Sequence, residues 1–556
     1  MKDRSLDFAV GSPRFADPQL AALAASEGAL AAWREAFACH GAAAAAGVTG
    51  AFAVGLTEPS GRAFLAVDRF AIDSLCWRVD GAGGLRFAAR ADALADASTG
   101  LDPQAIFDYL FFHAIPSPRT VYQGIFRLPP AHAAVFDNGR LSVAPYWAAT
   151  FREAQNPSFD ALRTQFRDHL RDAVTAQLDG GKPGCFLSGG TDSSTVAGMI
   201  GVAAGRPAAT YSIGFDAAGY DEMEYARIAA RHFGTEHHEY YVTPADLVRS
   251  IPAVAAHCDQ PFGNSSSLPA YYCAKMAKDD GVGRILAGDG GDELFGGNSR
   301  YAKQRLFGFY DNVPGGLRSA LVEPLLNAPG AARIGLLRKA SSYVEQARVP
   351  MPDRLQMYNL LLRLGIDRVL TPAFIASVDT ADPARQQQQV WNAARGASAI
   401  NRTLAFDWRY TLAENDLPKV CGTTRMAGIG VGFPMLDARL HDFSLTLPSA
   451  YKLKGLKLRW FFKEALRGFL PDAILAKKKQ GFGLPFGVWV QRDAALRGLA
   501  VDSLRSLATR GIVRPDFIDA LLGVHFEQHP AYYGEMIWIL MMLEQWLRAK
   551  APDHGR

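Results

Sequence analysis

The stretch FLSGGTDSSTVAG, residues 186–198, most strongly constrains how this chain can fold. Two glycines and several small polar residues lie between an apolar run and the start of a helix, with Asp192 among them. Gly189 and Gly190 allow a tight backbone turn and the close approach of a ligand. The stretch therefore predicts a strand, a tight loop and a helix in direct succession.

The segments that follow alternate between strand and helix patterns. GCFLS, ATYSIGF, EHHEYYV and RILAGD are expected to be short strands, and helical stretches such as DSSTVAGMIGVAA and DEMEYARIAARHF alternate with them. Alternation at this spacing predicts a parallel α/β sheet. From about residue 300 the pattern is mostly helical. The late apolar run MIWILMMLEQWL is too short to span a bilayer and contains Glu544, so we expect a buried helix.

The first 150 residues have a different pattern. Short apolar runs alternate with turn signals, and Asp137-Asn138-Gly139 lies between two such runs, which predicts a hairpin in a β-rich region. Apolar residues on one face of the segment 159–174 then predict a helix. A chain of 556 residues is too long for one core. We expect domains at 1–150 and 151–548, followed by a tail at 549–556.

Composition narrows the class of protein. The chain is 49% hydrophobic and carries a net charge of only +4, which favours a globular protein without a nucleic-acid partner. Its six cysteines include no Cys-x-x-Cys pair, so neither a disulfide framework nor a zinc site is predicted. The first fifteen residues lack the apolar core of a signal peptide. We therefore expect a cytoplasmic protein that does not bind membranes.

The loop SGGTDSS has the composition of a phosphate site. It follows a strand and opens a helix, which is where ligands bind in open α/β sheets. The free N–H groups at the helix start favour an anion. Asp192 would repel a phosphate unless a cation intervened, so it predicts bound Mg²⁺. A capped helix would need one such residue rather than seven in this order.

The motif S-G-G-x-D-S-S is the signature of the PP-loop ATP pyrophosphatases, which cleave ATP to AMP and pyrophosphate. Segments 115–132, 211–239, 287–301 and 477–490 resemble asparagine synthetases in the same order, and the resemblance extends from about residue 50. It implies an N-terminal Ntn-glutaminase-like, class II amidotransferase-like β sandwich. A parallel-sheet ATP pyrophosphatase domain with a helical C-terminal part would follow it.

The resemblance also implies roles for single residues. Asp289 would accept a proton from the incoming amine, and Lys479 would contact the phosphates and the adenylate. The alternative for Asp289 is an Asp/Gly turn on a surface loop, and the alternative for Lys479 is an exposed position among three lysines. Asp192 and Asp292 would hold Mg²⁺ on the pyrophosphate. ATP would be contacted by Leu187, Ser188, Gly189, Gly190, Asp192, Ser193, Ser194, Ile213, Ala287 and Gly288.

Two departures from the family pattern bear on function. Glutamine-dependent members begin Met-Cys-Gly, whereas this sequence begins Met1-Lys2-Asp3. Cys39 and Cys76 are internal and lack the α-amine that this chemistry uses as base, so we expect them to be buried and the domain to lack glutaminase activity.

The second departure lies in the segment 419–437. Cys421, Gly422, Gly430 and Gly432 stand where the family has charged residues. Losing these charges should weaken recognition of aspartate. The small residues could make room for a larger acceptor, or they could simply form a glycine-rich turn. Both departures resemble the divergent branches of the family, β-lactam synthetase and the lasso-peptide cyclases.

We therefore expect an asparagine synthetase-like ligase that uses ATP and Mg²⁺. It would adenylate a small-molecule or peptide carboxylate and transfer ammonia or an amine to it, and by analogy it would form a homodimer. One alternative is a nucleotide-binding, non-catalytic partner of an intact synthetase. Another is a PP-loop sulfur transferase, which would require a reactive cysteine pair and a basic RNA-binding face.

Overall fold

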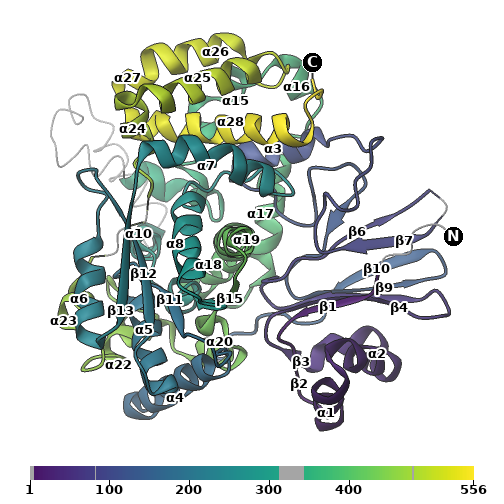
Figure 1. The fold of residues 1–556 in the computed structure, drawn as a ribbon, viewed down its shortest axis with the longest axis vertical. Helices are drawn as coiled ribbons and strands as arrows, with labels where there is room; N and C mark the ends of the chain where they lie inside the picture. The colour runs from purple at the N-terminus through teal and green to yellow at the C-terminus, as the bar shows by residue number, and fades with distance from the viewer. Residues whose placement is uncertain (1–5, 82, 312–342, 479–480, 482, 556) are drawn as a thin grey trace.

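The N-terminal region of the computed structural model is built from antiparallel sheets (Figure 1). The structure describes residues 6–81, 83–311, 343–478, 481 and 483–555. Asn138 and Gly139 both have positive φ and form a two-residue turn between two strands, so the predicted hairpin is confirmed. The larger sheet has the order β1-β4-β5-β9-β10. Its strands are β1 (Phe8–Gly11), β4 (Phe52–Thr57), β5 (Ala63–Val67), β9 (His132–Asp137) and β10 (Arg140–Pro145).

Both faces of this sheet are covered. Trp33 and Phe37 of a helical pair pack against Phe52 and Phe64 on one face. A smaller sheet, in the order β7-β6-β8, packs on the other face through a shared apolar cluster. The result is the predicted β sandwich with helices outside it. The elements are α1 (Pro18–Glu27), α2 (Ala29–His40), β6 (Cys76–Val79), β7 (Leu85–Ala88) and β8 (Phe126–Arg127).

A five-stranded, fully parallel sheet forms the centre of the rest of the chain. Its order is β13-β12-β11-β14-β15, so consecutive strands run outward from β11 and the order reverses between β11 and β14. Such a reversal leaves a crevice at the carboxyl ends of the strands, where ligands bind. The strands are β11 (Gly184–Phe186), β12 (Ala209–Phe215), β13 (Glu236–Val242), β14 (Arg284–Leu286) and β15 (Gly430–Gly432).

Helices cover both faces of the parallel sheet, as the predicted α/β class requires. One face packs against α5 and α6, with α4 against α5, and the other packs against α8 and α19. The amphipathic segment predicted at 159–174 is α4, and its apolar face is buried. These helices are α4 (Phe159–Thr175), α5 (Thr191–Ala204), α6 (Met223–Phe233), α8 (Ser267–Asp279) and α19 (Leu417–Ala427).

The C-terminal part is helical. Helix α28 (Pro530–Lys550) packs against α7 (Pro244–His257), α24 (Phe486–Arg492) and α25 (Ala494–Ala508). Residues 536–547 of α28 are buried, as the sequence predicted. Among the described residues, none of the helices combines the length and the apolarity needed to cross a membrane.

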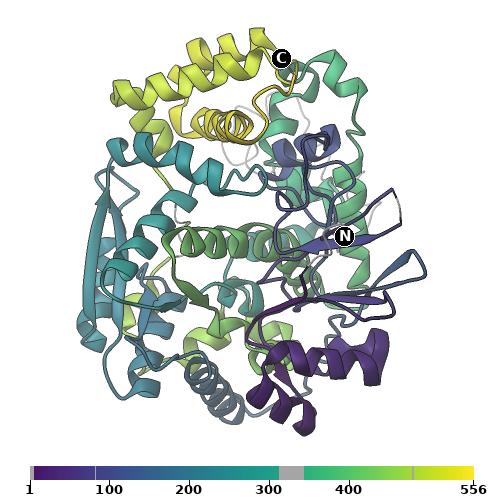
Figure 2. The same ribbon diagram turned by 45° about the vertical axis from the view of Figure 1, so that its right-hand side comes forward.

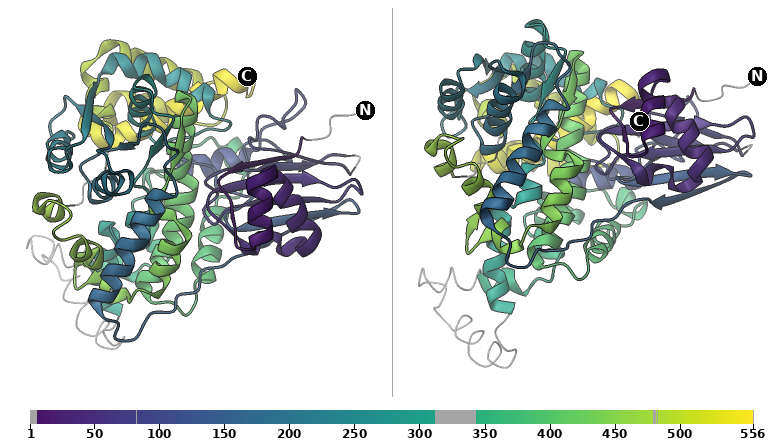
Figure 3. Two further views of the ribbon diagram at one scale, coloured as in Figure 1. Left: turned by 60° about the horizontal axis from the view of Figure 1, so that its bottom comes forward. Right: turned by 90° about the horizontal axis from the view of Figure 1, so that it is seen from below.

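One continuous helical stretch connects the two halves of the molecule. It consists of α18 (Ala399–Asp407), the π-helical segment η5 (Trp408–Asp416) and α19. Figures 2 and 3 show the N-terminal sheets on one side of the α/β half, with this helical stretch between them. Buried residues of η5 contact both halves: Glu414 accepts a hydrogen bond from Ser117, and Trp408 donates one to the carbonyl of Glu293.

Candidate active site

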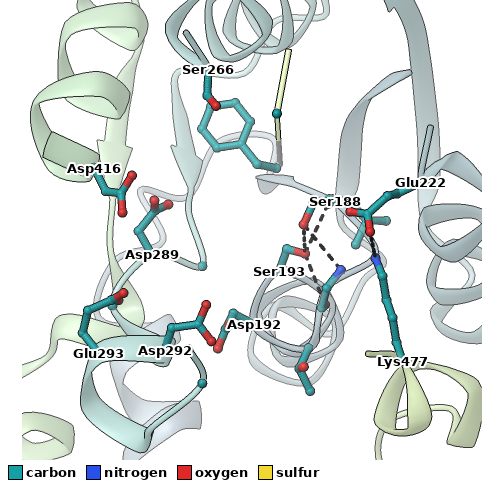
Figure 4. Close-up of a pocket in the computed structure, with 18 of the residues that line it drawn as sticks. Ser188, Asp192, Ser193, Glu222, Ser266, Asp289, Asp292, Glu293, Asp416 and Lys477 are labelled. Atoms are coloured by element: carbon teal, nitrogen blue, oxygen red, sulfur yellow. Dashed lines mark hydrogen bonds and ion pairs between the residues drawn. The ribbon is translucent and has the colours of Figure 1, made fainter. Parts of the chain in front are cut away.

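A cavity of about 1080 Å³ opens at the reversal point of the parallel sheet. The loop that follows β11 forms one wall, and the loop that follows β14 contributes to the opposite wall (Figure 4). Because parallel strands end at the same edge of a sheet, two segments 100 residues apart meet here.

The wall after β11 is the start of helix α5. This helix begins at Thr191 without a side-chain cap, because its N-cap residue is Gly190. Ser193 stabilises the loop through hydrogen bonds instead. Its Oγ accepts a hydrogen bond from the backbone N–H of Ser188 at 3.2 Å and lies 3.1 Å from the Ser188 Oγ. An uncapped helix start in a cavity wall presents N–H donors to an anion.

Two carboxylates converge on one guanidinium at the edge of this loop. The Nη1 of Arg459 lies 2.7 Å from Asp192 and 2.8 Å from Asp292, and its Nη2 also contacts Asp192. Asp292 lies in α9 (Gly291–Phe295), and Arg459 is buried. Oxygen donors from two carboxylates are ligands that Mg²⁺ accepts, so the pair fits the predicted metal. Their role as ligands stays a prediction.

Asp289 lies at the end of the loop after β14, beside a second acid. Lys419 Nζ is 2.9 Å from Asp416 and 3.7 Å from Asp289, so one ammonium connects the two carboxylates. Desolvation raises the pKa of Asp289, against the charge of Lys419, and Asp416 adds to the rise. Desolvation alone would lower the pKa of Lys419, but the two acids outweigh it and raise that pKa, so the ammonium stays charged.

A third acid lies behind this pair. Glu293 is buried, and its pKa is raised well above the ordinary value, first by burial and then by the charge of Asp292. The cavity thus has an acidic side and a serine-rich side, which face each other in Figure 4.

The lysine run at 477–479 lies partly in the cavity. Lys477 and Lys478 line it, and Lys477 Nζ lies 3.1 Å from Glu222 and 3.4 Å from the carbonyl of Gly189. Lys479, predicted to be catalytic, lies outside the described residues. The structure therefore brings Lys477 to the loop before α5, and the role of Lys479 stays a prediction.

Most of the residues predicted to contact ATP surround one cavity. Gly189, Ser194 and Ala287 do not themselves line it: the Gly189 carbonyl faces Lys477, and the other two are buried behind the wall. The predicted residues that line it are Leu187, Ser188, Gly190, Asp192, Ser193, Ile213, Gly288, Asp289 and Asp292.

The small residues of segment 419–437 do not enlarge this cavity. Gly430 and Gly432 lie in β15, and a Cβ on Gly432 would come within 2.7 Å of Leu286 on the neighbouring strand. Cys421 and Gly422 line a separate cavity of about 100 Å³ between the N-terminal region and α19. The suggestion that these four residues make room for an acceptor is wrong for the main cavity.

The cysteines of the N-terminal region differ from each other. Cys76 is buried, as expected, and burial raises the pKa of its thiol. Cys39 is exposed, so the expectation that it is buried is wrong: it lies in the last turn of α2, with its Sγ 3.3 Å from the carboxylate of Glu35 one turn earlier. The hydrogen bond to Glu35 raises the pKa of the Cys39 thiol. All six cysteines are free.

Sequence reasoning missed Arg459, Lys419 and Asp416. Arg459 and Lys419 each lie more than 120 residues from the carboxylates of the two loops that they contact, and Asp416 is connected to Asp289 only through Lys419. Local periodicity carries no signal for such pairs. Lys419 and Asp416 could have been suspected from their position, because Lys419 opens the segment 419–437 that was compared with the family and Asp416 lies three residues before it.

The fold and this cavity define an α/β protein with a parallel sheet and a candidate ligand site at the carboxyl ends of its strands. A family model described as asparagine synthase matches residues 165–548, more than half of the chain, and the chain belongs to this family. A model described as glutamine amidotransferase domain matches residues 27–147.

Curated relatives agree with the family. Asparagine synthetase [glutamine-hydrolyzing] 1 of Bacillus subtilis is 24% identical over 464 residues, which are 83% of this chain and 71% of that protein. A putative asparagine synthetase [glutamine-hydrolyzing] of Mycobacterium tuberculosis is 24% identical over 78% of this chain and 66% of its own length. A second putative enzyme of that name, from Methanocaldococcus jannaschii, is 34% identical over 43% of this chain and 47% of its own. The chain thus spans less than two thirds of the latter two relatives.

Proposed function

We propose that this protein is an ATP-dependent carbon–nitrogen ligase that forms AMP. The observation that carries the proposal is the single cavity that joins an uncapped, serine-rich helix start to the Asp289–Lys419–Asp416 cluster. The helix start suits the binding of a triphosphate, and the Asp289–Lys419–Asp416 cluster suits proton transfer at an acyl group. Family membership supports the same class of reaction.

The reaction would proceed in two balanced steps. A carboxylate oxygen of the acceptor attacks the α-phosphorus of ATP, the bond to the β-phosphate oxygen breaks, and pyrophosphate leaves. The nitrogen of ammonia or an amine then attacks the acyl carbon, AMP leaves, and a proton passes from the nitrogen to Asp289. The amide, AMP and pyrophosphate are the products.

The residues at the helix start would hold the phosphates. The backbone N–H groups of α5 and the hydroxyls of Ser188 and Ser193 would donate to phosphate oxygens. Asp192 and Asp292 would hold Mg²⁺, which when bound neutralises charge on the departing pyrophosphate. The guanidinium of Arg459, already between these acids, would add a second fixed positive charge.

Asp289 fits the role of proton acceptor. Its raised pKa makes it a better base than an exposed carboxylate, and Lys419 keeps it from becoming permanently protonated. By the resemblance, Lys479 would contact the phosphates from the lysine run.

We further propose that the N-terminal region does not hydrolyse glutamine. Neither of its cysteines suits a nucleophile, because the pKa of each thiol is raised and Cys76 is buried as well. Ammonia or an amine would therefore come from solution or from another protein.

Pyrophosphate release tests the proposal. The assay contains ATP, Mg²⁺, ammonium and a panel of carboxylic acids, with glutamine replacing ammonium in a parallel series. We expect pyrophosphate release with ammonium and none with glutamine. We also expect Asp192→Asn and Asp292→Asn each to lower the rate of release by at least 100-fold, because losing one group that stabilises charge in a transition state costs about 10²–10³ in rate. Full activity in both variants would overturn the phosphate-site assignment.

A further inference from the structure

A second cavity, of about 750 Å³, adjoins the first. His113, Asn415, Asp416 and Glu535 line both cavities. Asp416 is bound to the same Lys419 that contacts Asp289. The junction of the two cavities therefore lies beside the acids at which we place the reacting carboxyl group.

Aromatic side chains form much of the wall of this second cavity, which we call the aromatic chamber. The rings of Phe112 and Tyr410 are stacked, with centroids 5.3 Å apart and planes 10° apart. Arg363 lies over the rings of both Tyr358 and Tyr532 at 5.8 and 5.5 Å. Tyr358 is 61% exposed, so part of this wall remains uncovered.

The π-helical segment η5 carries residues of both cavities. Tyr410 faces the aromatic chamber, and Asp416 lies at the junction. The wider turn of a π-helix places side chains that an α-helix would rotate away, and such turns often occur at functional sites. The Tyr410 hydroxyl makes no hydrogen bond to another described residue, so it is available as a polar contact for a ligand.

We propose that the aromatic chamber binds the body of the acceptor acid and that this body contains an aromatic ring. The inference rests on the proposed function, since it assigns the acid of that reaction. Offset or edge-on contacts with Tyr410 and Phe112 would hold such a ring. A volume of this size suits drug-sized ligands, roughly 300–1,000 Å³, and aspartate would leave most of it empty.

Isotope exchange between ATP and pyrophosphate tests the acid independently of any amine. The probes are 3-phenylpropionate and aspartate, each with ATP and Mg²⁺. We expect 3-phenylpropionate to support exchange at least tenfold faster than aspartate. Tyr410→Leu should raise the KM for 3-phenylpropionate by at least tenfold, and Tyr410→Phe, which keeps the ring, should raise it far less.

Two controls separate the possible failures. Phe126→Leu alters an aromatic residue that is 38% exposed on the N-terminal sheet, outside both cavities, and should leave the KM unchanged. ATP affinity, measured by titration calorimetry, should be equal in all variants. Loss of ATP binding by the unmodified protein would count against the proposed function itself.

The chamber assignment fails on its own in three cases, each with ATP binding intact. In the first, aspartate supports exchange and 3-phenylpropionate does not. In the second, neither acid supports exchange. In the third, 3-phenylpropionate supports exchange and its KM is the same in Tyr410→Leu as in the unmodified protein.

Discussion

Lys419 sets the charge balance of the acidic side of the cavity, and its removal should change the pH dependence of the reaction. Desolvation and Asp416 raise the pKa of Asp289, and Lys419 lowers it. In Lys419→Met the lowering is lost, so the pKa of Asp289 rises further. A cation at this distance lowers a carboxyl pKa by about 1–3 units.

In the proposed reaction Asp289 must be deprotonated, so activity should be lost as the pH falls through the pKa of this residue. The acid limb of the kcat/KM profile should therefore move to higher pH in Lys419→Met, by about one unit or more. Lys419→Arg keeps the charge and should keep the limb in place. An acid limb at the same pH in Lys419→Met would argue against Asp289 as the base.

Arg459 is the second single residue whose role can be tested. It is the buried cation that Asp192 and Asp292 share. In Arg459→Ala both carboxylates face the triphosphate without this charge, so we expect the KM for ATP to rise at least tenfold. Arg459→Lys should recover part of the loss, and circular dichroism checks that both variants fold. An unchanged KM for ATP in Arg459→Ala would exclude Arg459 from the proposed phosphate site.

At the scale of elements, the loop before α5 depends on the packing of one glycine. Gly189 has φ +65°, and a Cβ there would lie 2.4 Å from the backbone N of Ala226 in α6. Gly189→Ala should therefore displace the loop from α6 and lower the affinity for ATP by at least tenfold. Gly201→Ala, within α5 and with open space around it, should not lower the affinity for ATP. Titration calorimetry with ATP compares the two variants, and equal affinities would show that the loop tolerates displacement.

The elements that present the site could be predicted because their signals are local. The strands predicted at 209–215 and 236–242 are observed with those bounds, since residues that favour turns precede them: Gly205 and Pro207 before the first, and Gly234 before the second. The π-helical register of 408–416 could not be predicted, because its apolar spacing does not distinguish it from an α-helix. The convergence of Asp416 and Lys419 on Asp289 depends on that register and on tertiary packing.

At the scale of the whole molecule, a buried ion cluster connects the N-terminal region to the helical stretch that carries η5. Glu414 is 3% exposed and contacts Arg127, Arg409 and Ser117, with its carboxylate 2.7 Å from the Ser117 hydroxyl. Burial acts to raise the pKa of Glu414, but the two arginines outweigh it, so the pKa is lowered. Its contribution to stability is therefore present at neutral pH and is lost as the pH falls through the lowered pKa.

Glu414→Ala should destabilise the connection between the two halves. It leaves two arginines uncompensated in a buried interface, at a cost of about 3–5 kcal/mol. Because Glu414 is two residues from Asp416, pyrophosphate release should fall as well. Glu414→Gln keeps the side-chain oxygen that Ser117 donates to and should lose less.

The measurement is urea unfolding at pH 7, followed by tryptophan fluorescence and by circular dichroism, because two probes reveal separate transitions of the two halves. Asp516→Ala removes an exposed ion pair with Arg514 and serves as the control, for which no measurable change is expected. Equal midpoints for Glu414→Ala and Asp516→Ala would mean that the buried cluster does not stabilise the connection. A lower midpoint with unchanged pyrophosphate release would mean that the cluster holds the halves together without positioning Asp416.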